Sequence, residues 1–249
     1  MSHSLNGQTA LVTGATSGIG RATAQLLAER GAHVIVSGRN AERGEQTVLA
    51  IRTAGGKADF IRADLAGAAD ARALAAAATD ITGGIDILVN NAGIYPFVAS
   101  ADTTEDVFDQ VYDTNVKVPF FLATALIPAM VNKGAGSVIN IGTVASTKGV
   151  PGSTAYASSK AAVDQLTRVW AAEYGPAGLR VNAVVPGIIV TEGSKAALGD
   201  EPGPFLASTP AGRAGQPQEI AAAVAYLVSD DATFINGAFL AVDGGASAL

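Results

Sequence analysis

The sequence predicts a doubly wound α/β fold, in which helices cover both faces of a parallel seven-stranded sheet. Two observations carry this prediction. Short runs rich in Val and Ile alternate with longer helical segments along the chain, and this alternation is typical of parallel strands joined by crossover helices. The 249 residues also contain no linker, repeat or low-complexity tract. We therefore expect one domain over residues 1–249.

The predicted strands are apolar throughout, as strands buried on both faces should be. They are Thr9–Thr13, His33–Ser37, Ala58–Arg62, Ile85–Asn90, Ser137–Gly142, Arg180–Val185 and Ala238–Val242. The helices predicted between them are Gly18–Arg30, Ala41–Ala54, Ala68–Thr82, Thr103–Asn132, Thr154–Tyr174 and Pro217–Ser229. The crossovers should be right-handed.

One segment interrupts the alternation. Residues Glu192–Gly215 hold three prolines and five glycines. Loops of that length in compact domains are usually functional lids or else disordered, and we expect a flexible substrate lid at about 192–215.

Composition excludes several function classes. Hydrophobic residues make up 49% of the chain, charged residues 15%, and the net charge is −6 without any basic run, so neither nucleic acid nor a membrane is an expected partner. The absence of cysteine excludes disulfides and thiolate chemistry. The two histidines, His3 and His33, are poorly placed for a catalytic triad or a metal site.

The N-terminal residues do not resemble a signal peptide, so a cytoplasmic location is expected.

A glycine-rich loop joins the first strand to the first helix. Gly14 permits the tight turn out of the strand, Gly18 lets the backbone approach a ligand, and Gly20 allows close packing of the helix on the sheet. The free N–H groups at the helix start then favour a pyrophosphate. Thr16 and Ser17 add hydroxyl donors, and Ile19 is the next residue of the helix start. A turn packed for its own sake is the alternative, but the strand before and the helix after favour a nucleotide.

The end of the second strand indicates which dinucleotide binds. A fold that binds NAD usually places an acid here, about twenty residues past the glycines, to hold the ribose 2′-hydroxyl. This chain instead has Ser37, Gly38, Arg39 and Asn40. The guanidinium of Arg39 suits a 2′-phosphate, and Ser37 and Asn40 are further donors. We therefore predict NADP(H) in preference to NAD(H), with a solvated arginine as the alternative.

Tyr156 and Lys160 lie four residues apart at the start of a predicted helix. Residues at this spacing share one helix face. A neighbouring ammonium favours the phenolate and lowers the pKa of the tyrosine, which would make it an acid/base for a hydroxyl proton. The pair is uninformative alone and gains its weight from the glycine-rich loop.

Together these motifs resemble those of the short-chain dehydrogenase/reductase family, in its single-domain, Rossmann-type form. The resemblance covers essentially the whole chain. The motifs occur in the family's order and spacing: Thr13-Gly14-x-x-x-Gly18-x-Gly20, Asp64, Asn90-Asn91-Ala92-Gly93, Asn115, Tyr156-x-x-x-Lys160 and Pro186-Gly187.

The resemblance implies further cofactor contacts. Asp64 would accept a hydrogen bond from the adenine amino group, with Leu65 beside it, although Asp64 could simply cap the third helix. The adenine ribose would be bordered by Asn91, Ala92 and Gly93. The nicotinamide carboxamide would be held by Pro186, Gly187, Ile189 and Thr191.

The resemblance also implies four catalytic residues: Asn115, Thr143, Tyr156 and Lys160. Asn115 would disturb its helix and hold a water that relays protons to Lys160. The family usually has serine thirteen residues before the tyrosine, where this chain has Thr143. Threonine keeps the hydroxyl for the substrate carbonyl but adds a methyl group.

The implied reaction is hydride transfer between NADP(H) and a carbonyl or secondary alcohol, with Tyr156 as acid/base. The expected pocket walls are Ile94–Phe97, Val144–Lys148, Ile188 and residues 192–209, which favours a neutral substrate although Lys148 weakens that inference. The resemblance also implies a homotetramer or dimer. Two alternatives stay open: a catalytically silent NADP-binding sensor or scaffold, and an isomerase or epimerase on the same fold.

Overall fold

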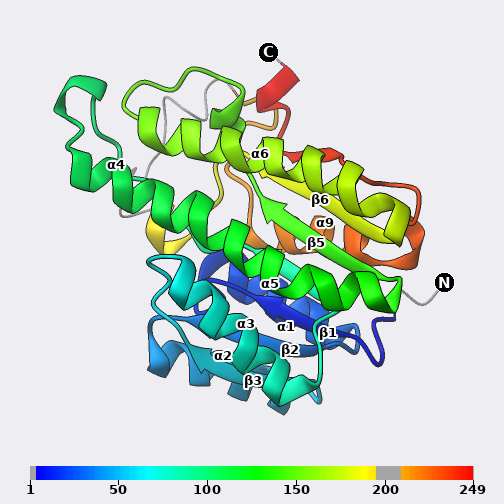
Figure 1. Cartoon of the computed structure of the whole chain (residues 1–249). Helices are drawn as coiled ribbons and strands as arrows, with labels where there is room; N and C mark the ends of the chain where they lie inside the picture. The colour runs from blue at the N-terminus through cyan, green and yellow to red at the C-terminus, as the bar shows by residue number, and fades with distance from the viewer. Residues whose placement is uncertain (1–3, 195–208, 249) are drawn as a thin grey trace.

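The computed structural model describes residues 4–194 and 209–248, and all seven predicted strands lie in one sheet (Figure 1). The strand order is β3-β2-β1-β4-β5-β6-β7, and every neighbouring pair is parallel. The strand order reverses at β1, which pairs with both β2 and β4. Doubly wound sheets bind ligands at such a switch point, at the carboxyl ends of the strands.

The observed elements match the predicted ones with small shifts at their ends, except for the predicted helix Thr103–Asn132. The strands are β1 Thr9–Val12, β2 His33–Gly38, β3 Lys57–Arg62, β4 Ile87–Asn90, β5 Gly136–Ile141, β6 Leu179–Pro186 and β7 Phe239–Val242. The long helices are α1 Gly18–Glu29, α2 Ala41–Thr53, α3 Ala68–Thr82, α4 Glu105–Tyr112, α5 Val118–Lys133, α6 Thr154–Tyr174 and α9 Pro217–Val228. Most of the predicted lid, residues 195–208, lies outside the described residues.

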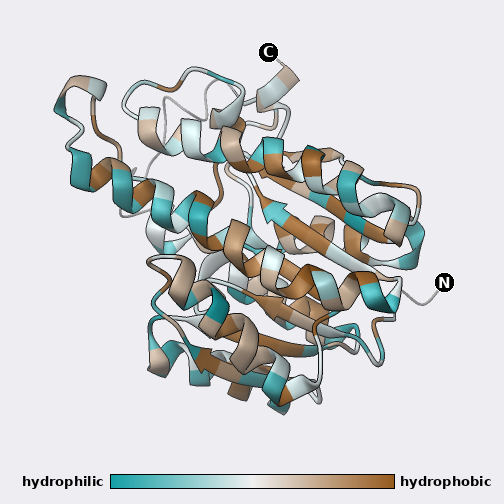
Figure 2. Cartoon of the chain, in the orientation of Figure 1, coloured by the Kyte–Doolittle hydropathy of each residue, from teal (hydrophilic) through white to brown (hydrophobic). Residues whose placement is uncertain are grey.

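Two hydrophobic clusters hold the helices on opposite faces of the sheet. Alternate residues of β1 supply both: Ala10 and Val12 belong to the cluster with α1, α2 and α9, whereas Leu11 belongs to the cluster with α3, α5 and α6. A strand whose residues are buried on both sides needs apolar side chains at consecutive positions. Figure 2 shows brown over much of the central strands, broken by a teal stretch near the end of β5.

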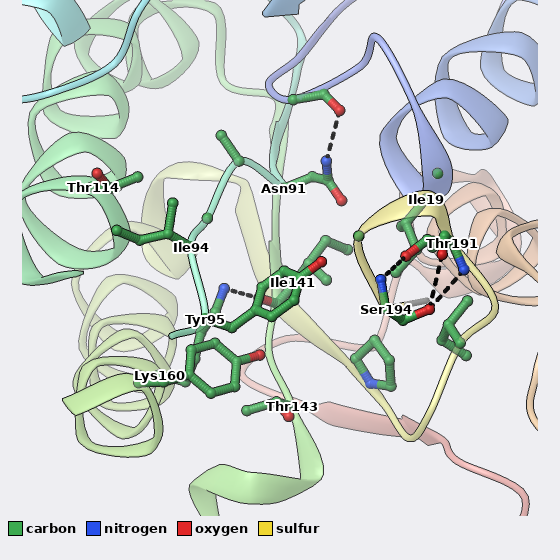
Figure 3. A pocket seen from close by; sticks show the side chains of 18 of the residues that line it. Ile19, Asn91, Ile94, Tyr95, Thr114, Ile141, Thr143, Lys160, Thr191 and Ser194 are labelled. Carbon is green, nitrogen blue, oxygen red and sulfur yellow. Dashed lines mark hydrogen bonds between the residues drawn. The ribbon is translucent and has the colours of Figure 1, made fainter. Parts of the chain in front are cut away.

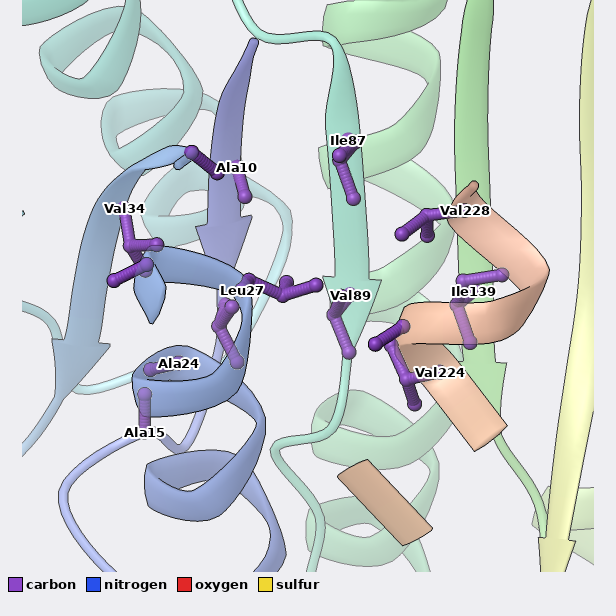
Figure 4. Close-up of a cluster of buried hydrophobic side chains, with 14 of the residues drawn as sticks. Ala10, Ala15, Ala24, Leu27, Val34, Ile87, Val89, Ile139, Val224 and Val228 are labelled. Atoms are coloured by element: carbon purple, nitrogen blue, oxygen red, sulfur yellow. The ribbon is translucent and has the colours of Figure 1, made fainter. Parts of the chain in front are cut away.

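The α1–α9 side of the core lies directly behind the switch point. Leu27 from α1 and Val224 from α9 are fully buried against the β4 and β5 side chains Val89 and Ile139 (Figure 4). Each such side chain contributes about 1.5–3 kcal/mol by leaving water. This packing fixes the start of α1, and with it the loop that leads from β1.

The predicted helix Thr103–Asn132 is interrupted. A π-helical turn, Asp113–Lys117, separates α4 from α5. Such turns widen the helix by one residue and occur frequently at functional sites. Asn115 sits within this turn and is 1% exposed, so the disturbance expected at Asn115 is present. The run Glu105–Lys133 has the length and composition of a membrane span, but its apolar side chains on α5 pack against α3 in the core.

Candidate active site

A cavity of about 940 Å³ lies at the carboxyl ends of the central strands. Figure 3 shows Tyr95, Thr143 and Lys160 on one side of it and Ile19, Thr191 and Ser194 on the other. Most predicted site residues line it: Gly14, Thr16, Ser17, Gly18, Ile19, Arg39, Asn40, Asp64, Leu65, Asn91, Ala92, Gly93, Thr143, Tyr156, Lys160, Pro186, Gly187, Ile189 and Thr191. Three predicted residues, Gly20, Ser37 and Asn115, do not line the cavity.

The glycine-rich loop is held by close backbone contacts. Gly14 has φ 63° and Gly18 has φ 51°, a conformation that residues with a Cβ rarely adopt. A Cβ on Gly20 would lie 2.3 Å from the Gly14 carbonyl oxygen, which explains why Gly20 packs beneath the loop instead of lining the cavity. The side-chain amide of Asn91 donates to the Thr13 carbonyl oxygen at 2.8 Å. Asn91 therefore ties the end of β4 to the loop.

The start of α1 is suited to an anionic group. The N-cap residue Ser17 makes no side-chain cap hydrogen bond, so its hydroxyl does not occupy the first N–H groups of α1. Ser17, Gly18 and Ile19 all border the cavity. Free N–H groups and the positive end of the helix dipole bind phosphate, so this loop fits the pyrophosphate of a dinucleotide.

The residues that follow β2 and β3 also border this cavity, which we call the groove. Arg39 and Asp64 face each other at 3.9 Å, and their side chains are 74% and 79% exposed. Asn40 caps α2, because its Oδ1 accepts from the backbone N–H of Arg43 at 2.9 Å. The Asn40 amide nitrogen remains as the donor that this residue can offer.

Ser37 does not reach the groove. It is fully buried within β2, and its hydroxyl has no hydrogen-bond partner among the described residues. The prediction that Ser37 donates to a 2′-phosphate is therefore wrong. The strand continues through Gly38, so Ser37 points into the sheet layer instead of leaving it with Arg39.

Asn115 connects the π-helical turn to α6. Its side chain accepts from the Ile94 backbone N–H at 2.9 Å and donates to the Ile94 carbonyl at 2.8 Å and to the Ser159 hydroxyl at 3.0 Å. A Cβ on Gly93 would lie 3.2 Å from Asn115 Oδ1 and 3.6 Å from Lys160 Nζ. Asn115 and Lys160 thus flank the same short stretch of backbone.

Tyr156 and Lys160 extend from the first turns of α6 toward the end of β5. Lys160 is 6% exposed, and its ammonium donates to the Ile141 carbonyl oxygen at 2.8 Å. Burial lowers the pKa of Lys160 to about 8, although the negative charge of Asp164 partly opposes this. Tyr95 packs edge-on against the Tyr156 ring, with 6.0 Å between the ring centroids.

The pKa of Tyr156 shifts in the direction opposite to the predicted one. Burial raises the pKa of the phenol, and a hydrogen bond with the Thr143 side chain only partly opposes this effect. The spacing to Lys160 predicted a lowered pKa. That prediction is wrong for the protein alone, because desolvation of the phenolate outweighs the neighbouring interactions.

Thr143 is the hydroxyl best placed beside Tyr156. It follows β5 and caps a short 3₁₀ helix, Val144–Ser146, by accepting from the Ala145 N–H at 3.3 Å. The nearby hydroxyls are engaged with backbone: Ser146 donates to the Thr143 carbonyl at 2.8 Å, and Ser153 donates to the Val150 carbonyl at 2.7 Å. Only Thr143 among these three borders the cavity.

The wall after β6 is braced by its own hydrogen bonds. The Thr191 N–H donates to the Ser194 hydroxyl at 2.8 Å, and the Ser194 N–H donates to the Thr191 hydroxyl at 2.9 Å (Figure 3). Ile189 forms a bridge with Gly215. A Cβ on Gly18 would lie 3.0 Å from Thr191 Cγ2. The segment therefore packs directly on the glycine-rich loop.

Two residues of the site were not singled out from the sequence. Asp164 lies one turn after Lys160, is 5% exposed, and has a pKa raised by burial. The sequence feature that could have indicated Asp164 is an acid four residues after a lysine on the same helix. Arg43 borders the cavity and forms an ion pair with Glu192 at 2.9 Å. These two residues are 149 positions apart, so no local pattern indicated the pair.

Known proteins resemble the chain over nearly its whole length. The family described as Enoyl-(Acyl carrier protein) reductase matches residues 14–247. A 2,5-dichloro-2,5-cyclohexadiene-1,4-diol dehydrogenase of Sphingobium indicum is 43% identical over 250 residues, covering 98% of this chain and 99% of that protein. A solved short chain dehydrogenase/reductase family protein is 46% identical with a TM-score of 0.91, and each chain is covered fully. Another solved structure, from Beutenbergia cavernae, is provisionally named an NAD(P) dependent gluconate 5-dehydrogenase and has bound NADP at low occupancy. It is 37% identical to this chain with a TM-score of 0.95, and both chains are covered fully.

Proposed function

The chain belongs to the short-chain dehydrogenase/reductase family, and from this premise we propose that it uses NADP(H) to interconvert a carbonyl compound and a secondary alcohol. The main observation that supports this proposal is that Thr143, Tyr156 and Lys160 border the same cavity as the glycine-rich loop. A phenol, a hydroxyl and an ammonium at one end of a dinucleotide-shaped groove suit polarisation of a carbonyl next to a nicotinamide.

The cofactor would be held along the whole groove. The uncapped start of α1 suits the pyrophosphate, Asp64 and Leu65 border the adenine end, and Lys160 has the charge to hold the nicotinamide ribose. Pro186, Gly187, Ile189 and Thr191 border the nicotinamide end. When bound, the nicotinamide supplies or accepts the hydride.

The protein residues carry the proton. Thr143 and Tyr156 would both donate hydrogen bonds to the substrate oxygen, and Tyr156 gives its proton to that oxygen as carbon receives hydride. A raised pKa keeps the Tyr156 phenol protonated at neutral pH, which supports a role as acid in carbonyl reduction. Asn115, beside Lys160, would position the water that restores the proton.

A neutral substrate is supported by the side chains around Tyr156. Apolar and aromatic side chains border the cavity, namely Ile94, Tyr95, Phe97, Val144 and Ile188, and Tyr95 packs against the Tyr156 ring. The ammonium of Lys148, the cation that complicates this inference, donates to the Ala246 carbonyl. A panel of ketones, aldehydes and secondary alcohols with NADPH or NADP⁺ tests the proposal: turnover of a neutral member is expected, and no turnover of any member would contradict it.

Cofactor choice is predicted to depend on Arg39. Replacing it by alanine removes a guanidinium that suits a 2′-phosphate, so NADPH binding should weaken by about tenfold while NADH binding changes little. The Arg39 side chain is 74% exposed, and because solvent screens an exposed charge, we expect no more than this roughly tenfold loss of NADPH affinity. Calorimetric titration of both cofactors measures the preference. Arg72→Ala on α3, where the guanidinium stacks on Phe121, is the control; an unchanged preference in Arg39→Ala would refute the assignment.

The charge of Lys160 predicts how NADPH binding depends on pH. The pKa of Lys160 is lowered to about 8, so the ammonium is present below that pH and lost above it. NADPH affinity should therefore fall as pH rises through about 8. The fall should persist in Tyr156→Phe and be absent in Lys160→Met. A wild-type affinity that stays constant between about pH 7 and 9 would count against a charged ribose contact.

We also propose assembly into a homotetramer, or a dimer, with closed symmetry. Phe108 on α4, Phe120 on α5 and Val169 on α6 are 44%, 37% and 45% exposed, and apolar surface of this kind suits a subunit contact. Light scattering at micromolar concentration should give the mass of an oligomer, and Phe120→Asp should lower it. A fully active monomer would contradict the proposal. The cytoplasmic location stays a prediction.

A further inference from the structure

An ion pair joins the two sides of the cofactor groove. Arg43 Nη1 lies 2.9 Å from Glu192 Oε2, with side chains 42% and 65% exposed. Arg43 belongs to the first turn of α2, next to the predicted 2′-phosphate residue Arg39, whereas Glu192 directly follows Thr191 after β6. The pair therefore links the adenosine end of the groove to the segment on its nicotinamide side.

The glycine-rich loop lies between the segments that this pair connects. A Cβ on Gly38, at the end of β2, would lie 2.6 Å from Thr16 Cγ2. On the other side, Thr191 Cγ2 would lie 3.0 Å from a Cβ on Gly18. The Arg43–Glu192 pair spans the same two flanks, so the guanidinium of Arg43 lies beside the loop that would hold the phosphates.

The two described arginines that border the cavity each already face an acid. Arg39 lies 3.9 Å from Asp64 and Arg43 lies 2.9 Å from Glu192. The Nε of Arg43 is buried and has no hydrogen-bond partner among residues 4–194 and 209–248. A guanidinium binds phosphate best through two parallel N–H groups, and Nη1, one of the two terminal nitrogens of Arg43, is already paired with Glu192.

We propose that Arg43 is a second cation for the 2′-phosphate of NADP(H) and that Glu192 competes with this phosphate for it. Glu192 then limits how strongly NADP(H) is preferred over NAD(H). The inference rests on the proposed NADP(H) preference and adds the residue that moderates it. A dianionic phosphate presents more charge and more acceptors than one carboxylate, so it displaces Glu192, whereas the 2′-hydroxyl of NAD(H) leaves the ion pair intact.

Calorimetric titration with two probes tests the inference without turnover. Adenosine 2′,5′-bisphosphate carries the discriminating phosphate, and adenosine 5′-monophosphate lacks it. Arg43→Gln should weaken the bisphosphate about tenfold and leave the monophosphate unchanged. Glu192→Gln should tighten the bisphosphate by about twofold to fivefold, because the competing ion pair is partly exposed. Unchanged monophosphate binding also shows that each variant keeps its folded groove.

The double variant and a matched control identify the cause. In the Arg43→Gln background, Glu192→Gln should have no further effect, because the shared partner is gone. Glu42→Gln removes a charge from the same first turn of α2, where Glu42 instead accepts from Gln46, and should change bisphosphate affinity less than Glu192→Gln does. Equal effects of Glu192→Gln and Glu42→Gln on bisphosphate affinity would mean that removing any nearby negative charge has the same result, and would overturn the inference.

The outcomes also separate this inference from the proposed function. A wild-type protein that binds both probes equally would overturn the NADP(H) preference and this inference together. A wild-type preference for the bisphosphate that Arg39→Ala abolishes, but that neither Arg43→Gln nor Glu192→Gln alters, would overturn this inference alone.

Discussion

Tyr156→Phe is expected to lower turnover of a carbonyl substrate by ~10²–10⁴ while leaving the fold and NADPH binding intact. The substitution removes one hydroxyl and keeps the ring, so the edge-on packing against Tyr95 survives. What is lost is the proton that the substrate oxygen must receive. Steady-state rates with calorimetric NADPH binding on the same protein separate loss of chemistry from loss of binding.

Tyr112→Phe is the matched control for this experiment. Its hydroxyl donates to Ser158 at 3.0 Å on the solvent side of α6, and it does not border the cavity. We expect turnover close to that of the wild type. A Tyr156→Phe protein that retained near wild-type turnover would remove the proposed proton donor and leave a dinucleotide-binding protein with unexplained chemistry.

Thr143→Ala is expected to lower turnover by ~10²–10³, by analogy with removal of one oxyanion donor. The hydroxyl that bonds Tyr156 and would bond the substrate oxygen is lost. The backbone of the turn is still held by the Ser146 hydroxyl. Thr143→Ser keeps the hydroxyl and drops the methyl group, so activity should remain and the substrate range should widen.

Thr147→Ala serves as the control for Thr143. Its hydroxyl donates to the Val144 carbonyl in the same turn and is exposed. The rates of Thr143→Ala, Thr143→Ser and Thr147→Ala should therefore be measured on one substrate and compared with each other. Unchanged turnover in Thr143→Ala would mean that no side chain at this position is needed, since the structure directs Ser146 to the backbone.

The sequence predicted those parts of the site that depend on short spacings. The loop from Gly14 to Gly20 and the pair Tyr156–Lys160 each lie within one turn or one helix, so their geometry follows from local structure. Their meeting in one cavity follows from parallel strands, whose carboxyl ends share an edge. The strand ends were less predictable, and Ser37 shows the consequence: one more residue in β2 places its hydroxyl inside the sheet.

The parts that depend on tertiary burial could not be predicted. The pKa of Tyr156 is raised because the fold desolvates its phenol, and a spacing of four residues contains no information on burial. The disturbance of the helix at Asn115 was predicted, but the hydrogen bonds that Asn115 makes to Ile94 and Ser159 were not. The pairing of Arg43 with Glu192 depends on two segments meeting across the loop. Each is a contact between residues distant in sequence.

Transfer of deuterium from labelled cofactor tests the central claim most directly. NADPH carrying deuterium at its transferable position is incubated with the protein and a neutral ketone that it reduces, and the product alcohol is analysed by mass spectrometry and NMR. We predict one deuterium on the carbinol carbon, in a single configuration. An alcohol without deuterium, an isomerised substrate without net cofactor oxidation, or no turnover across the whole panel would contradict a hydride-transferring oxidoreductase.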